Sequence, residues 1–183
     1  MENIKNLTNS KLIKILFLCL MGSILLALSS KIKIPFYPVP MTMQTFVVIL
    51  LGITFGWKIG IATVSLYLFE GLVGLPVFSG TPEKGIGFIY FTGPTMGYLI
   101  GFLAAVFFAG KFNYNNNLLI NFFKIFFATS FIYIFGLLWL GNLIGWDKPI
   151  FKLGAQPFLL AEIFKIILAT LLANKLRKIK DYL

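Results

Sequence analysis

The stretch that decides the fold is residues 155–173, AQPFLLAEIFKIILATLLA, an apolar run long enough to span a membrane that nevertheless carries two charges. Glu162 and Lys165 lie near its middle, where each charged side chain costs about 2.5–3.5 kcal/mol on insertion. Because residues three apart share one face of a helix, the pair presents an acceptor beside a donor. We therefore expect this face to form the floor of a small-molecule site inside a helix bundle.

Two other interpretations of the charged pair remain open at this point. In one, Glu162 and Lys165 only neutralise each other within the bundle and bind nothing. In the other, the pair serves an intramembrane enzyme, with Glu162 as general base, or a transporter of another small carboxylate. A catalytic pair needs a nucleophile or a metal nearby, and the other acid in an apolar segment, Glu70, lies near the outer end of its span. We therefore expect no catalytic residue and no enzymatic activity.

The rest of the chain has the composition of a membrane protein. Of 183 residues, 58% are hydrophobic and 12% are charged, and the mean hydropathy is +0.91. These values exclude an ordinary soluble domain, because about 20 apolar residues suffice for each membrane-spanning helix. We expect an all-α integral membrane protein, a compact six-helix bundle forming one domain over residues 1–183. The expected spans are residues 12–29, 42–56, 59–74, 93–110, 118–141 and 155–173.

The positive charges predict how the bundle is oriented. The net charge of +10 is concentrated before the first span, at Lys11 and Lys14, and after the last span, at Lys175, Arg177 and Lys178. This is the positive-inside pattern, so we expect both termini in the cytoplasm and the ligand cavity toward the extracytoplasmic side. We expect a multi-pass protein of the bacterial cytoplasmic (inner) membrane, in contact with the lipid bilayer and not with nucleic acid.

The chain offers little for metal or nucleotide chemistry. It has no histidine, one cysteine and six acidic residues, which argues against a metal site. No P-loop sequence G-x-x-x-x-G-K-[ST] is present, so the chain cannot use ATP through a P-loop. We expect no cofactor, and any ATP would be used by partner subunits.

Two segments interrupt the helical pattern. Residues 31–44, KIKIPFYPVPMTMQ, contain three prolines within six residues, which exclude a helix and favour extended or turn backbone. Since such backbone cannot face lipid, it lies at the outer surface or folds over a cavity, where Phe36 and Tyr37 are suited to covering an apolar ring. Residues 75–91, LPVFSGTPEKGIGFIYF, form the longest interruption. Its length and aromatic content predict a gate.

Small residues indicate close helix contacts. Ser23 and Ala27 lie four apart in the first span and let another helix approach, either in the same chain or in a partner. Gly93, Gly97 and Gly101 begin a ladder of small residues that continues to residue 109, and Tyr98 lies beside it, where it can face the cavity.

Four motifs resemble one known family. Residues 34–44 (IPFYPVPMTMQ), 71–80 (GLVGLPVFSG), 93–102 (GPTMGYLIGF) and 157–165 (PFLLAEIFK) together are similar to the BioY family. These proteins are the biotin-specific substrate-binding (S) components of energy-coupling-factor (ECF) vitamin transporters. The resemblance implies a six-helix protein that captures biotin outside the cell. It also implies a partner module made of a transmembrane coupling subunit and ATP-binding subunits, docked on Ser23 and Ala27.

The resemblance also implies a binding site. The family's acid-x-x-lysine maps onto Glu162 and Lys165, which would meet the ureido group and the carbonyl or carboxylate of biotin. Aromatic walls would cover the ring and the methylene tail. Lys84 is the basic residue of the expected gate. Either Lys84 or Lys165 could meet the carboxylate of biotin, and the choice between them stays open. The other implied substrate-binding residues are Phe36, Tyr37, Thr42, Gln44, Phe78, Ser79, Tyr90, Gly93 and Tyr98.

Overall fold

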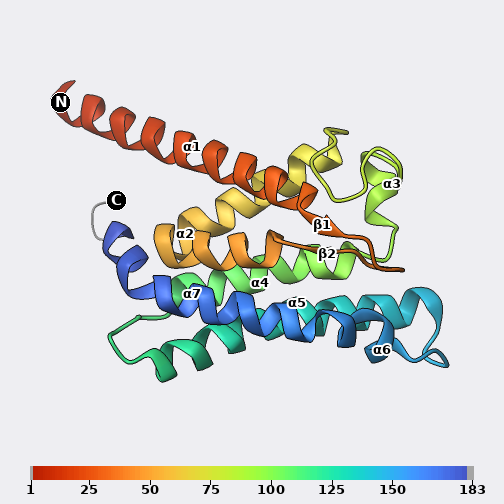
Figure 1. Cartoon of the computed structure of the whole chain (residues 1–183). Helices are drawn as coiled ribbons and strands as arrows, with labels where there is room; N and C mark the ends of the chain where they lie inside the picture. Colours follow the sequence, from red (N-terminus) through yellow and green to blue (C-terminus); the bar gives the residue numbers. More distant parts are fainter. Residues whose placement is uncertain (1, 181–183) are drawn as a thin grey trace.

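The protein is a bundle of long helices with most of its non-helical chain at one end and the connection at residues 112–117 at the other (Figure 1). The computed structural model describes residues 2–180, with side chains for residues 11–179. The helices are α1 (Glu2–Lys31), α2 (Gln44–Leu72), α3 (Phe88–Phe91), α4 (Met96–Lys111), α5 (Leu118–Ile144), α6 (Ile150–Gly154), the short 3-10 helix η1 (Gln156–Phe158) and α7 (Leu159–Lys180), and the two strands are β1 (Lys33–Ile34) and β2 (Met41–Thr42).

The expected all-α membrane bundle is confirmed. Among the residues that the structure describes, four helical stretches are long and apolar enough to cross a membrane: Lys11–Lys31, Gln44–Leu72, Leu118–Ile144 and Ile150–Ile179. The shorter apolar helix α4 lies among them. The beginning of α1 and the end of α7 lie at the same end of the bundle, and the β1–β2 hairpin, α3 and α6 lie at the other (Figure 1). The exact boundaries of six separate spans stay a prediction.

Helix α2 folds back on itself at Gly56, whose backbone (φ 75°, ψ 172°) is outside the helical region and is readily adopted only by glycine. A Cβ atom added to Gly60 would lie 3.6 Å from the Cα atom of Gly52. Eight residues of straight helix would separate these positions by about 12 Å. The two halves of α2 therefore form a helical hairpin, whose arms are visible in Figure 1.

The small residues of α4 let it pack closely against both neighbours. A Cβ atom added to Gly101 would lie 2.6 Å from the Cα atom of Ile132 in α5. One added to Gly110 would lie 2.3 Å from the backbone nitrogen of Trp57, at the turn of α2. Helix α4 thus holds α2 and α5 in place, and the close contacts expected from the ladder of small residues are confirmed.

The loop end of the bundle contains both interrupted segments. Strands β1 and β2 pair antiparallel, with Lys33 opposite Thr42, and residues 35–40 connect them. Because the three prolines cannot enter a helix, the chain forms this hairpin as the extended or turn backbone that we expected. The segment between α2 and α3 runs beside the end of α1, and its residues 78–81 are buried.

Candidate ligand-binding site

The two charged residues of α7 point into the bundle. The exposed fraction is 5% for Glu162 and 6% for Lys165. The Lys165 Nζ atom lies 3.3 Å from the Glu162 Oε2 atom. Lys165 also donates hydrogen bonds to the Thr42 carbonyl oxygen (2.7 Å) and to Thr45 Oγ1 (3.0 Å). All three donors of the ammonium therefore have protein partners, which is the condition for burying a charge.

The Glu162 carboxylate is held from three helices. Its Oε2 atom accepts hydrogen bonds from Thr45 Oγ1 of α2 (3.1 Å) and Tyr133 OH of α5 (2.9 Å), in addition to Lys165 of α7. Thr45 accepts from the ammonium and donates to the carboxylate, so it links the two charges. The hydrogen bonds described for this carboxylate all go to Oε2, so Oε1 has capacity for a further donor. We call Glu162, Lys165, Thr45, Tyr133 and the Thr42 carbonyl the Glu162 cluster.

Two members of the Glu162 cluster, Thr45 and Tyr133, are not among the substrate-binding residues predicted from the sequence. Thr45 lies in the first turn of α2, three residues after Thr42 of β2, and its place at the outer start of the helix was a usable signal. Tyr133 lies within the aromatic run of α5, and a buried tyrosine hydroxyl usually has a hydrogen-bond partner. That general rule predicts a partner for Tyr133 but does not identify Glu162 as the partner.

A small cavity, which we call the chamber, lies in front of the Glu162 cluster. It has a volume of about 40 Å³ and is roofed by residues 39–42 of the β1–β2 hairpin. This volume is far below the roughly 300–1,000 Å³ of typical ligand pockets, so the chamber is closed in this conformation. Its lining residues are Val39, Pro40, Met41, Thr42, Thr45, Tyr98, Ile132, Tyr133, Phe158, Glu162 and Lys165.

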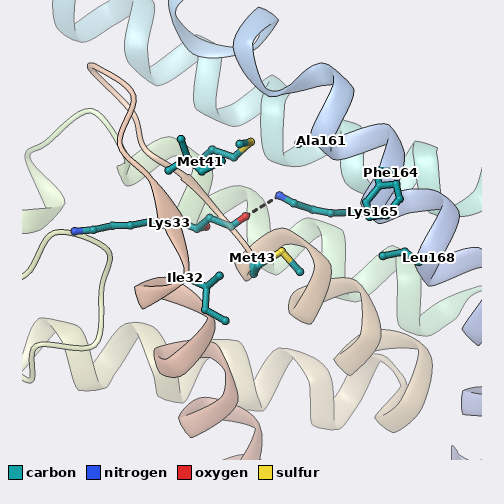
Figure 2. A pocket seen from close by; sticks show the side chains of 10 residues that line it. Ile32, Lys33, Met41, Met43, Ala161, Phe164, Lys165 and Leu168 are labelled. Carbon is teal, nitrogen blue, oxygen red and sulfur yellow. Dashed lines mark hydrogen bonds between the residues drawn. The ribbon is translucent and has the colours of Figure 1, made fainter.

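A larger groove of about 260 Å³ lies between the β1–β2 hairpin and α7. Figure 2 shows Lys165 reaching across it to the Thr42 carbonyl, with Phe164 and Leu168 on the α7 side. The chamber and the groove share Met41, Thr42 and Lys165, so the ammonium lies where they meet. The arrangement can therefore receive the polar end of a ligand in the chamber and an apolar part along the groove.

Three of the sequence-predicted residues besides the charged pair lie at or near the chamber. Thr42 and Tyr98 line it, and the Tyr98 hydroxyl donates to the Gly154 carbonyl (2.8 Å). Phe36 packs edge-on against Phe158 of the chamber wall, with ring centroids 5.7 Å apart. Tyr37 is on the same hairpin but is 91% exposed, so it does not cover the chamber in this conformation.

The remaining predicted contact residues lie elsewhere and do not line the chamber or the groove. Phe78 stacks on Tyr90 with ring centroids 4.7 Å apart, and the Tyr90 hydroxyl donates to the Ser79 carbonyl (2.6 Å). Gln44 donates to the Tyr67 hydroxyl (2.6 Å), in the same aromatic cluster. The Gly93 carbonyl accepts a hydrogen bond from Trp139 Nε1 (2.9 Å).

The predicted docking residues face inward in the isolated chain. Ser23 is 1% exposed and donates a hydrogen bond to Glu70 Oε1 of α2 (2.7 Å). Ala27 is half-buried and packs against the core. A partner would reach these residues only if α1 moved away from α2, so their docking role stays a prediction.

Comparison with known proteins places this geometry in a family. The BioY family profile matches residues 3–181. The chain is 34% identical to the "Probable biotin transporter BioY" of Pyrococcus horikoshii, over 84% of this chain and 90% of that protein. It is 32% identical to the "Biotin transporter BioY" of Thermotoga maritima, over 85% and 91% of the two chains.

A solved structure is similar over almost the whole length. The crystal structure of the S-component for biotin from an ECF-type ABC transporter superposes with a TM-score of 0.76 and 25% sequence identity. The similarity covers 93% of this chain and 94% of that chain. The family profile, the sequence relatives and the shared fold agree, and the chain therefore belongs to the BioY family.

Proposed function

We propose that this chain is the biotin-capturing S-component of an ECF-type transporter. The observation that carries the proposal is the Glu162 cluster at the wall of the chamber, an acceptor and a donor held side by side. The ureido group of biotin has two N–H donors and one carbonyl acceptor, and the valerate tail ends in a carboxylate. Glu162 Oε1 would accept from the ureido group, while Lys165 would donate to the ligand carbonyl or carboxylate.

The chamber would have to enlarge for biotin to bind. Residues 39–42 form its roof, and the bond from Lys165 to the Thr42 carbonyl ties this roof to α7. A ligand oxygen that took the place of that carbonyl would keep the ammonium satisfied while the β1–β2 hairpin moved. The groove beside Lys165 is almost wholly apolar and suits the methylene tail. Movement of a hairpin is a common way to admit a ligand to a closed site.

Transport would depend on partner subunits. We propose that a transmembrane coupling subunit and ATP-binding subunits supply the energy, because the chain has no P-loop and resembles a component of an ABC transporter. The distribution of lysines supports both termini on the cytoplasmic side of the bacterial inner membrane. The chamber in front of the charged pair would then open toward the outside of the cell. Because the relatives are named as transporters, transport replaces the enzymatic alternative.

A biotin titration of the purified chain tests the proposal. Lys165→Ala should weaken binding at least a hundredfold, because the ammonium is buried in the binding cluster. Lys152→Ala in α6 is the matched control and should leave the affinity unchanged. Equal losses in the two variants would contradict the site assignment. Mass spectrometry of small molecules carried through purification, with dethiobiotin as competitor, would separate biotin from close precursors.

A further inference from the structure

Lys31, the last residue of α1, is surrounded by oxygen atoms of the long loop. Its Nζ atom donates to the carbonyls of Pro76 (2.8 Å) and Phe78 (2.9 Å). It also lies 3.4 Å from the carbonyl and 3.3 Å from the hydroxyl of Thr81. The loop thus turns three backbone carbonyls and one hydroxyl toward a single ammonium, more than 40 residues away in the sequence. We call these residues the Lys31 cluster.

Hydrogen bonds and packing on the inner side of the loop also hold it to the bundle. Ser30 Oγ and Tyr67 OH both donate to the Val77 carbonyl, at 2.7 Å and 3.1 Å. The Phe78 side chain is 1% exposed, and an added Cβ atom on Gly71 would lie 2.0 Å from its ring. The tip of the loop is therefore packed into the bundle at Phe78 and capped by Lys31 at its outer side.

The β1–β2 hairpin has fewer hydrogen bonds to the rest of the bundle, although Phe36 packs against Phe158 and the Val39 side chain is only 5% exposed. The hairpin is tied to α7 by the bond from Lys165 to the Thr42 carbonyl and paired within itself by two residues in each strand. Tyr37 near its tip is 91% exposed. Fewer hydrogen bonds to the bundle lower the free energy of local opening, so the two interrupted segments differ in the ease with which they move.

We propose that Lys31 is a positioning residue that fixes residues 75–81 to the end of α1. Under this proposal the long loop moves only together with α1. The attachment concerns the protein alone and does not depend on the identity of the ligand.

Hydrogen exchange of the full chain in lipid nanodiscs, without ligand, tests the attachment. The backbone N–H groups of Val77, Thr81 and Lys84 donate within the loop and report its opening. Lys31→Met should speed exchange over residues 75–84 about threefold, because water can partly replace the ammonium at the exposed carbonyls. Exchange in α4 and α5 should not change. Lys31→Arg should restore slow exchange, because arginine keeps the charge and the donors.

Lys33→Met is the matched control, since Lys33 is the neighbouring exposed lysine and no contact holds it to the loop. Wild-type exchange over residues 75–84 in Lys31→Met would overturn the proposal, and so would equal acceleration in α4 and α5. If the methionine variant does not fold, Lys31→Gln decides: faster exchange confined to the loop supports the attachment, and unchanged exchange refutes it.

A second measurement addresses access to the chamber and rests on the proposed function. Cross-linking the β1–β2 hairpin to α7 through cysteines at positions 41 and 164 should slow biotin association at least tenfold, and reduction should restore it. Association that stays fast in the cross-linked chain would refute access past the hairpin. Absence of biotin binding in the wild-type chain would instead contradict the proposed function and leave the exchange result standing.

Discussion

Lys165 and Lys31 both donate to several protein oxygens, but their surroundings differ. Lys165 is 6% exposed and bonds a carboxylate, a hydroxyl and one carbonyl inside the bundle. Lys31 lies at the exposed rim and bonds neutral carbonyls and a hydroxyl of one loop. A charge deep in the bundle requires a counter-charge, whereas a charge at the rim keeps part of its hydration. The first lysine suits ligand binding, and the second suits holding a loop.

The largest effect should come from breaking the buried pair on one side. Lys165→Met leaves the Glu162 carboxylate buried without a counter-charge, which should lower the free energy of unfolding by about 3–5 kcal/mol. Thermal unfolding in detergent measures this loss. The double variant Glu162→Leu with Lys165→Leu should recover most of the stability while binding no biotin. A double variant as unstable as the single one would show that charge compensation is not the reason for the pairing.

A smaller effect should follow from removing one donor to the carboxylate. Tyr133→Phe deletes the hydrogen bond to Glu162 Oε2 and keeps the aromatic ring against Tyr98. Loss of a hydrogen bond to a charged group should lower the free energy of unfolding by about 1.5 kcal/mol. Biotin affinity should fall by about tenfold, because the carboxylate loses its contact with α5. Isothermal titration measures the affinity, and an unchanged value would mean that Tyr133 does not position Glu162.

At the rim, Lys31→Met should cost less than about 1 kcal/mol in global stability, because water reaches the carbonyls that the ammonium leaves. Its main effect should be on exchange of the loop and not on the unfolding temperature. Thermal unfolding compared with Lys165→Met checks the ranking. A loss as large as that of Lys165→Met would mean that the two lysines do not differ in the way proposed.

The smallest effect should be at the exposed ion pair between Lys148 and Asp147, whose atoms are 2.9 Å apart with side chains more than half exposed. Lys148→Ala should change the free energy of unfolding by less than about 0.5 kcal/mol, because solvent screens such pairs. Biotin binding should not change. A measurable loss of affinity would mean that the ligand lies closer to this outer loop than a site in the chamber implies.

Several features were predictable because they depend on local sequence. The expected spans 42–56 and 59–74 left room for only a tight turn between them, and Gly56 provides the reversal of the chain. The three prolines indicated a non-helical segment before α2. The apolar run of α7 with its two charges indicated an inward-facing polar pair. In each case the signal comes from residues within a few turns of one another.

Other features depended on contacts between distant segments. Thr45 and Glu162 are 117 residues apart, and Lys31 and Phe78 are 47 apart. Gln44 was expected at the ligand, but the fold of α2 brings Tyr67 within 2.6 Å of it. Ser23 was expected at a partner surface and is hydrogen-bonded to Glu70. Helical periodicity indicates which face of a helix is buried, but it does not identify the neighbour on that face.

The sequence by itself determined that this chain is a helical membrane bundle with one charged pair turned inward, because the cost of placing charge in hydrocarbon applies to each segment separately. Only the tertiary structure decided which groups satisfy the pair and which loop Lys31 holds. Those choices follow from how α2, α5 and α7 pack, since hydrogen bonds form only where packing brings donors and acceptors within about 3 Å.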